Sequence, residues 1–185
     1  KLGASDTDKV RGKRIEKQAL VSLEKLYQQT SSYEKGIAVL QRLSELMPEQ
    51  SKDFYHRIAE LSLKLYQDDQ AVHYATLAVQ LNPDDARAQA RLGDIYFKMQ
   101  RLESAVVQYR VAVDLDPRAF DIQVKLAGIL VDLGKFREAE TLYREITKTA
   151  TDESLVLSAA RESIALAEVD QRLEEVEGDF FPLVY

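Results

Sequence analysis

Two histidines are the side chains in this sequence best suited to bind a metal ion or to transfer a proton near neutral pH. No cysteine stands anywhere in the chain to complete a metal site with His56 or His73. The sequence also lacks a glycine-rich phosphate loop, a His-Glu-x-x-His pattern and a serine in a nucleophile-elbow context. We therefore predict that the chain is not an enzyme and has no catalytic residue. We also predict that it binds neither a metal nor a cofactor.

The distribution of charge argues against nucleic-acid binding. The net charge is −6 at pH 7 over 185 residues. Residues 1–17 carry six basic and three acidic side chains, whereas residues 152–179 carry two basic and nine acidic ones. This balance leaves no broad cationic surface to neutralise phosphates. It would allow the basic segment of one molecule to attract the acidic segment of another, and salt would screen that attraction.

The sequence shows no run of apolar residues long enough for a membrane span or a signal peptide. We therefore expect no direct membrane insertion, and a cytoplasmic location is favoured for this segment, although the compartment stays open. The chain begins at Lys1 without a methionine and ends on an apolar stretch. We interpret the sequence as a part of a longer protein.

The strongest pattern is a repeat with a period of 34 residues. At this offset Ala71, Ala105 and Ala139 coincide, as do Pro83 and Pro117. An earlier, divergent copy lies 35 residues upstream of the next one. The predicted units are residues 17–50, 52–85, 86–119 and 120–153. Each unit has room for two helices and two turns.

The spacing within a unit is helical. Ile58, Leu61 and Leu65 follow the rule for one apolar helix face. Gly134 lies in the turn between the two helices of the last unit and suits a left-handed helix cap. Pro83 ends the second helix of its unit because proline has no amide donor and clashes with the preceding turn.

Small residues recur where the two helices of a unit must approach closely. Ala59, Gly93 and Ala127 recur on the first helices, facing the alanines that recur on the second helices. The divergent first unit carries Glu24 at this position instead.

This pattern resembles the tetratricopeptide repeat family over residues 17–153. The family motif is represented best by Leu92-Gly93-Asp94-Ile95-Tyr96, Ala105, Tyr109, Ala112 and Pro117. The usual tryptophan is absent from every unit, and the fourth unit ends in Thr151 where proline is usual. The resemblance implies an all-α fold, a right-handed superhelical array of antiparallel helix pairs with about four repeats and a C-terminal capping helix.

The same resemblance implies a concave groove, lined by the first helices, that binds peptides or helices of partners. The residues at the groove offsets are Lys25, His56, Arg57, Glu60, Leu63, Lys64, Arg87, Arg91, Asp94, Phe97, Lys98 and Lys125. Arg57, Arg91 and Lys125 recur once per unit and would form a ladder for an acidic, extended ligand. In the alternative interpretation, Arg57 pairs with Glu60 and Arg91 pairs with Asp94 along their own helices.

The two ends extend the array. Residues 1–16 are a helical extension or the end of a preceding repeat, and Gly12 interrupts a long helix that spans about residues 6–29. Residues 154–177 form an acidic helix that caps the core or serves in docking or dimerisation. Gly178 is expected to end it, which leaves an apolar tail over residues 178–185. The candidates for self-association are Phe180, Phe181, Leu183, Val184 and Tyr185.

After these exclusions, the function that remains is the recognition of another protein by the surface of the chain. The first hypothesis is a non-catalytic adaptor or scaffold that holds a peptide or helix of a partner protein in its groove. The second is a structural segment of a larger repeat protein, which packs on its own neighbouring units or on other copies while any activity lies elsewhere. The sequence does not identify the partner.

Overall fold

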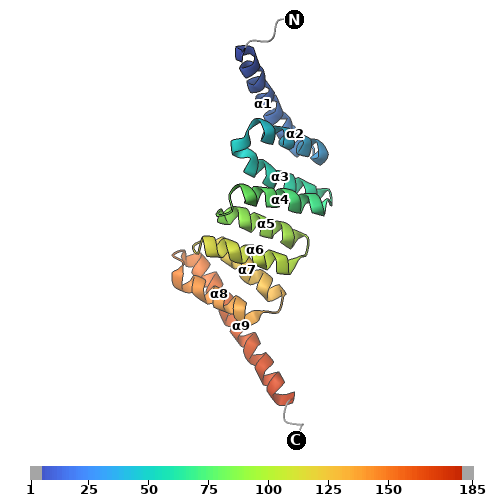
Figure 1. Cartoon of the computed structure of the whole chain (residues 1–185). Coiled ribbons are helices and arrows are strands. Elements are labelled where there is room, and N and C mark those ends of the chain that lie inside the picture. The colour runs from blue at the N-terminus through green and yellow to red at the C-terminus, as the bar shows by residue number, and fades with distance from the viewer. Residues whose placement is uncertain (1–5, 181–185) are drawn as a thin grey trace. The chain divides into compact units, whose positions relative to one another are not determined.

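The computed structural model describes the backbone of residues 6–180 and, within it, the side chains of residues 9–170 and 172. These residues form nine α-helices and one short 3-10 helix, with no strand among them (Figure 1). The helices are α1 (Asp6–Gln29), α2 (Tyr33–Leu46), α3 (Ser51–Lys64), α4 (Asp68–Leu81), α5 (Ala86–Lys98), α6 (Leu102–Leu115), α7 (Phe120–Asp132), α8 (Phe136–Thr149) and α9 (Glu153–Phe180), and the 3-10 helix is Pro48–Gln50. The prediction of an all-α fold is confirmed.

The chain forms two compact units, residues 1–100 and 101–185. In the first unit, α1 to α5 pack each against the next in sequence, and α3 also contacts α5. In the second unit, α6 to α9 pack in the same sequential way. The predicted repeat 86–119 therefore contributes α5 to the first unit and α6 to the second.

One backbone conformation recurs at the turn that follows a first helix. Ser31, Tyr66, Gln100 and Gly134 have φ angles of 52°, 57°, 58° and 71°, in the left-handed region. In three of these turns a hydrogen bond of a left-handed cap closes the helix: Ser32 N to Tyr27 O, Gln67 N to Ser62 O, and Lys135 N to Leu130 O, at 3.0, 2.9 and 2.8 Å. The expectation that Gly134 suits such a cap is confirmed, and the other three turns use a residue with a side chain.

A side-chain cap starts α5. The carboxylate of Asp85 accepts hydrogen bonds from the backbone N–H of Arg87 and Ala88 at 2.9 and 3.2 Å. Lys52 Nζ lies 2.7 Å from the same side chain and joins the start of α3 to the start of α5. The hydrogen bond from Lys52 lowers the pKa of Asp85 below its ordinary value. The carboxylate therefore stays ionised and caps the helix at neutral pH.

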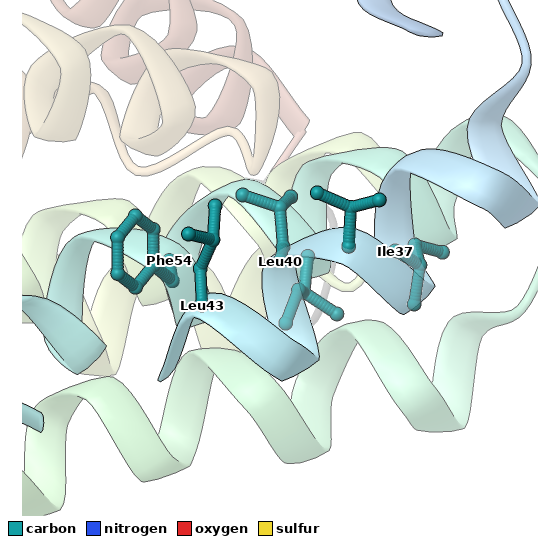
Figure 2. Close-up of a cluster of buried hydrophobic side chains, with 6 residues drawn as sticks. Ile37, Leu40, Leu43 and Phe54 are labelled. Atoms are coloured by element: carbon teal, nitrogen blue, oxygen red, sulfur yellow. The ribbon is translucent and has the colours of Figure 1, made fainter. Parts of the chain in front are cut away.

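The core is built from alanines at close contacts and from larger side chains between them. Ala59, Ala71 and Ala75 are fully buried together in the first unit, as Ala127 and Ala139 are in the second. Beside them, α2 and α3 contribute the cluster Ile37, Val39, Leu40, Leu43, Phe54 and Ile58 (Figure 2). Small residues at the repeated positions let the helix backbones approach, and the larger ones fill the space that remains.

The structure corrects one sequence prediction at the C-terminal end. Gly178 does not end the last helix, because α9 continues to Phe180. A glycine inside a helix costs about 1 kcal/mol relative to alanine, which is too little to stop a helix by itself. Among the described side chains of α9, Ala159 and Leu166 are buried, whereas Leu157 and Ile164 are exposed.

Candidate partner-binding surface

Most of the predicted groove residues lie on two neighbouring helices of the first unit. His56, Arg57, Glu60, Leu63 and Lys64 are on α3, and Arg87, Arg91, Asp94, Phe97 and Lys98 are on α5. Lys25 lies on α1 and is exposed, while Lys125 lies on α7 of the second unit. The candidate surface is therefore the pair α3 and α5, which pack against each other.

The middle of this pair forms a small polar pocket. A cavity of about 20 Å³ is lined by His56, Glu60, Arg91, Asp94, Ile95 and Lys98, five of which are predicted groove residues. Arg91 Nη1 lies 3.7 Å from Asp53 Oδ1. Arg91 therefore forms an ion pair between helices, with Asp53 at the start of α3.

His56 is buried in this pocket, with 5% of its surface exposed. Burial, reinforced by the positive charge of Arg91, lowers the pKa of His56 to about 4. The imidazole is therefore neutral near pH 7. Its Nε2 atom is buried and has no hydrogen-bond partner, so it can still make a hydrogen bond with a water molecule or with a bound group.

A larger cleft opens where α3 and α5 end. It has a volume of about 640 Å³ and is lined by Glu60, Leu63, Lys64, Tyr66, Asp68, Lys98, Met99 and Gln100. Four of these residues were predicted from the groove offsets; Tyr66, Met99 and Gln100 come from the turns that follow α3 and α5, and Asp68 begins α4. Tyr66 is the most exposed large side chain there, at 91%. A tyrosine directly before the polar stretch Gln67-Asp68-Asp69 was the signal in the sequence that could have identified it.

Arg57 has a different role from the one predicted. Its guanidinium forms an ion pair with the carboxylate of Glu24 on α1. The side chain of Glu24 is 7% exposed. Burial lowers the pKa of Arg57 relative to a free arginine. Arg57 therefore neutralises the glutamate that replaces a small residue in the first unit. The negative charge of Glu60, the partner considered on its own helix, also acts on Arg57.

Two of the remaining predicted residues, Lys64 and Lys125, each lie near an aromatic ring. The Nζ atom of Lys64 lies 5.0 Å from the ring centroid of Tyr33, and that of Lys125 lies 6.0 Å from the ring centroid of Tyr109. Arg87 and Phe97 are exposed, and Leu63 is half-buried. The side chain of Phe180, together with Phe181, Leu183, Val184 and Tyr185, lies outside the residues whose side chains are described.

No group of three or more histidine, cysteine, aspartate or glutamate side chains in the described part of the chain could hold a metal ion. Within the same part, none of the helices combines the length and the apolar character needed to cross a membrane.

Comparisons with known proteins agree with this architecture. The family model described as TPR repeat matches residues 93–134. No curated protein matches the chain. Among solved structures, MamA from Desulfovibrio magneticus RS-1 is 23% identical with a TM-score of 0.58, and the match covers 71% of this chain and 74% of that one.

Two further structures are more distant in sequence. Kinesin light chain TPR-like repeats from Podosopora anserina are 16% identical with a TM-score of 0.63, over 87% of this chain and 90% of that one. A tetratricopeptide repeat protein from Parabacteroides merdae is 10% identical with a TM-score of 0.68, over 83% of this chain and 60% of that one. The repeat in the sequence, the family match over residues 93–134 and the likeness to these solved structures together show that the chain has a fold of the tetratricopeptide repeat type.

Proposed function

We propose that this chain is a non-catalytic adaptor that binds a peptide or helix of a partner protein on the surface of α3 and α5. Tetratricopeptide repeat proteins are commonly scaffolds for protein–protein interaction. The observation that carries the proposal is the cleft of about 640 Å³ at the ends of these helices. A volume of that size lies in the range of about 300 to 1,000 Å³ that is typical of ligand sites.

The lining of the cleft indicates what it would bind. Leu63, Tyr66 and Met99 offer apolar surface, and Lys64 and Lys98 lie beside them. We infer that an apolar side chain of the partner enters the cleft while an acidic group of the same segment meets the lysines. Exposed aromatic residues are common energetic centres of interfaces, so Tyr66 is the first residue to test.

The first experiment replaces Tyr66 by asparagine, which tolerates the left-handed backbone of this turn. Proteins captured from an extract of the source cells by the parent chain and by the Y66N variant are quantified by mass spectrometry. We expect the partner to be depleted by about tenfold, because truncating a central interface aromatic typically costs 1 kcal/mol or more.

A second variant tests the charge of the cleft. Lys64→Glu combined with Lys98→Glu should reduce capture of the same partner, whereas Arg118→Glu combined with Lys148→Glu changes the net charge equally at exposed positions outside the cleft. Arg57 is left unchanged, since its loss would unpair the buried Glu24. If all variants captured the partner equally, the surface of α3 and α5 would not be its binding site.

A second candidate function rests on exposed apolar residues at both ends of the described chain. Val10 and Ile15 on α1, and Leu157 and Ile164 on α9, are exposed. A structural segment of a larger repeat protein would pack such residues against neighbouring units or other copies. Sedimentation at rising protein concentration and low salt tests self-association, and a monomer under every condition would contradict that form of the proposal.

A further inference from the structure

The second unit contains a separate cleft on α6, α7 and α8. We call it the α8 cleft; its volume is about 470 Å³ and it is lined by Arg110, Val113, Asp114, Leu126, Leu130, Glu138, Thr141, Leu142 and Glu145. Leu126 and Leu130 of α7, which are 3% and 1% exposed, form its floor. Arg110 of α6 forms an ion pair with Glu138 of α8. The α8 cleft shares no residue with the surface proposed above, and a binding role here goes beyond that function.

In the first unit, a larger side chain occupies the repeat position that is equivalent to Leu142. Tyr74 on α4 occupies the repeat position that Leu142 occupies on α8, two periods of 34 residues later. Tyr74 packs in the hydrophobic clusters beside α3, and its ring centroid lies 5.6 Å from that of Tyr55. Gln41 on α2 donates a hydrogen bond of 2.7 Å to the Tyr74 hydroxyl.

The equivalent residues of the second unit cannot fill the space in this way. Arg110 stands at the repeat position of Gln41, and Leu142 has no ring and no hydroxyl to accept its hydrogen bond. Arg110 pairs with Glu138 instead. Because the position that holds a tyrosine ring in one unit holds a shorter leucine in the other, the α8 cleft has room for an aromatic side chain from outside the chain.

The charges around the α8 cleft indicate what would accompany such a side chain. Glu138 neutralises Arg110, while Asp114 and Glu145 form no ion pair within the described part of the chain. Their carboxylates border an apolar floor, where a bound cation would be partly shielded from water and its attraction strengthened. Val107 and Val111 of α6 are exposed and extend the apolar surface of that helix.

We propose that the α8 cleft is a docking site for a partner protein whose binding segment inserts a tyrosine or phenylalanine side chain flanked by lysine or arginine. The ring replaces the missing equivalent of Tyr74 above Leu126 and Leu130. The cationic residue meets Asp114 and Glu145.

Two variants separate the two parts of the proposal. Leu142→Tyr combined with Arg110→Gln rebuilds the arrangement of Tyr74 and Gln41 and should close the α8 cleft with the chain's own ring. Asp114→Lys combined with Glu145→Lys leaves the space open and reverses its charge. Circular dichroism and thermal unfolding establish that each variant is folded before binding is measured.

The probe is a phage-displayed library of random dodecapeptides selected on the immobilised chain and, in parallel, on each variant. We expect peptides enriched on the parent chain to carry an aromatic residue next to lysine or arginine. Representative synthetic peptides, measured by fluorescence anisotropy, should bind both variants about tenfold or more weakly. Glu34→Lys combined with Glu49→Lys makes the same charge change at exposed positions of the first unit, outside both clefts; this matched control should bind them as the parent does.

Three results would overturn the proposal. One is enrichment of the same peptides on the parent and on the folded closed variant, and another is enrichment of acidic peptides or of none. The third is self-association of the parent in sedimentation that the closed variant loses, because a second copy would then be the occupant. If the Y66N variant captured the partner as well as the parent does, the proposal for the α8 cleft would still stand, since the two surfaces share no residue.

Discussion

At the scale of single residues, the buried polar groups determine most of what can be tested. Glu24 occupies a position where the other units have alanine or glycine, and it is buried there with Arg57 as its ion-pair partner. The sequence showed that Glu24 was exceptional. It did not show the partner, because Arg57 lies on another helix and the pair forms only when α1 and α3 are brought together.

Removing one member of this pair should cost more than removing both. Arg57→Ala would leave the Glu24 carboxylate buried and unpaired, and we expect the free energy of unfolding to fall by about 2 kcal/mol. Glu24→Ala restores the small residue of the other units. In that background Arg57→Ala should cost far less, as urea denaturation of the four proteins would measure. An equal cost in both backgrounds would contradict the pairing.

His56 should make stability depend on pH. Its pKa is about 4 in the folded chain and about 6.5 when the chain is unfolded, so the unfolded state binds more protons between these values. The stabilisation is complete above about pH 6.5 and is lost as the pH falls towards 4, with a total of up to about 3 kcal/mol.

Urea midpoints of the parent and the His56→Gln variant, measured across this pH range, test the assignment. Glutamine has no titratable group, so the pH dependence of the variant should be shallower than that of the parent. Identical slopes for the two proteins would show that other groups cause the acid sensitivity.

At the scale of elements, the helices follow from the repeat, whereas the turns follow from backbone conformation. The four turns at Ser31, Tyr66, Gln100 and Gly134 use one left-handed residue each, and glycine occupies only the last. A left-handed residue with a side chain is less favourable than glycine by about 1 kcal/mol. The turn at Gly134 can therefore be predicted from the sequence, whereas the residues at the other three turns give only a weak signal.

Substitutions in these turns should shift stability in opposite directions. Tyr66→Gly should raise the free energy of unfolding by about 1 kcal/mol, and Gly134→Ala should lower it by about 1 kcal/mol. A methyl group at Gly134 would meet no other atom within 4 Å, so its cost is that of the backbone alone. Thermal unfolding of both variants measures the two shifts, and a neutral Gly134→Ala would contradict the left-handed assignment.

At the scale of the whole molecule, stability should vary along the chain. In a repeat array each helix is held by its neighbours, and a terminal helix has fewer of them. The side chains of residues 9–15 are all exposed on α1, whereas α3 packs against α2, α4 and α5. The first turns of α1 contribute little apolar burial, so they should open at a lower free energy than α3 does.

Amide hydrogen exchange followed by mass spectrometry tests this gradient. Peptides that cover residues 9–15 should exchange at least about a hundredfold faster than peptides from the middle of α3, a difference of roughly 3 kcal/mol in opening free energy. Equal protection of the two segments would indicate that the start of α1 is held by contacts beyond those described.

The sequence by itself determined the fold class, the 34-residue repeat and the positions where helices pack closely. These properties are local or periodic, since apolar spacing, small residues and prolines act on their own helix and recur every 34 residues. It also identified α3 and α5 as the carriers of most candidate binding residues.

The tertiary structure alone decided which side chains meet. It paired Arg57 with Glu24, buried His56 without a partner for its Nε2 atom, and opened the cleft beside Tyr66. It also showed Tyr74 packed and hydrogen-bonded in the first unit, and a cleft lined by Leu142, at the same repeat position, in the second. Each of these depends on distances between different helices, which helical periodicity cannot encode because it orders residues only along one helix at a time.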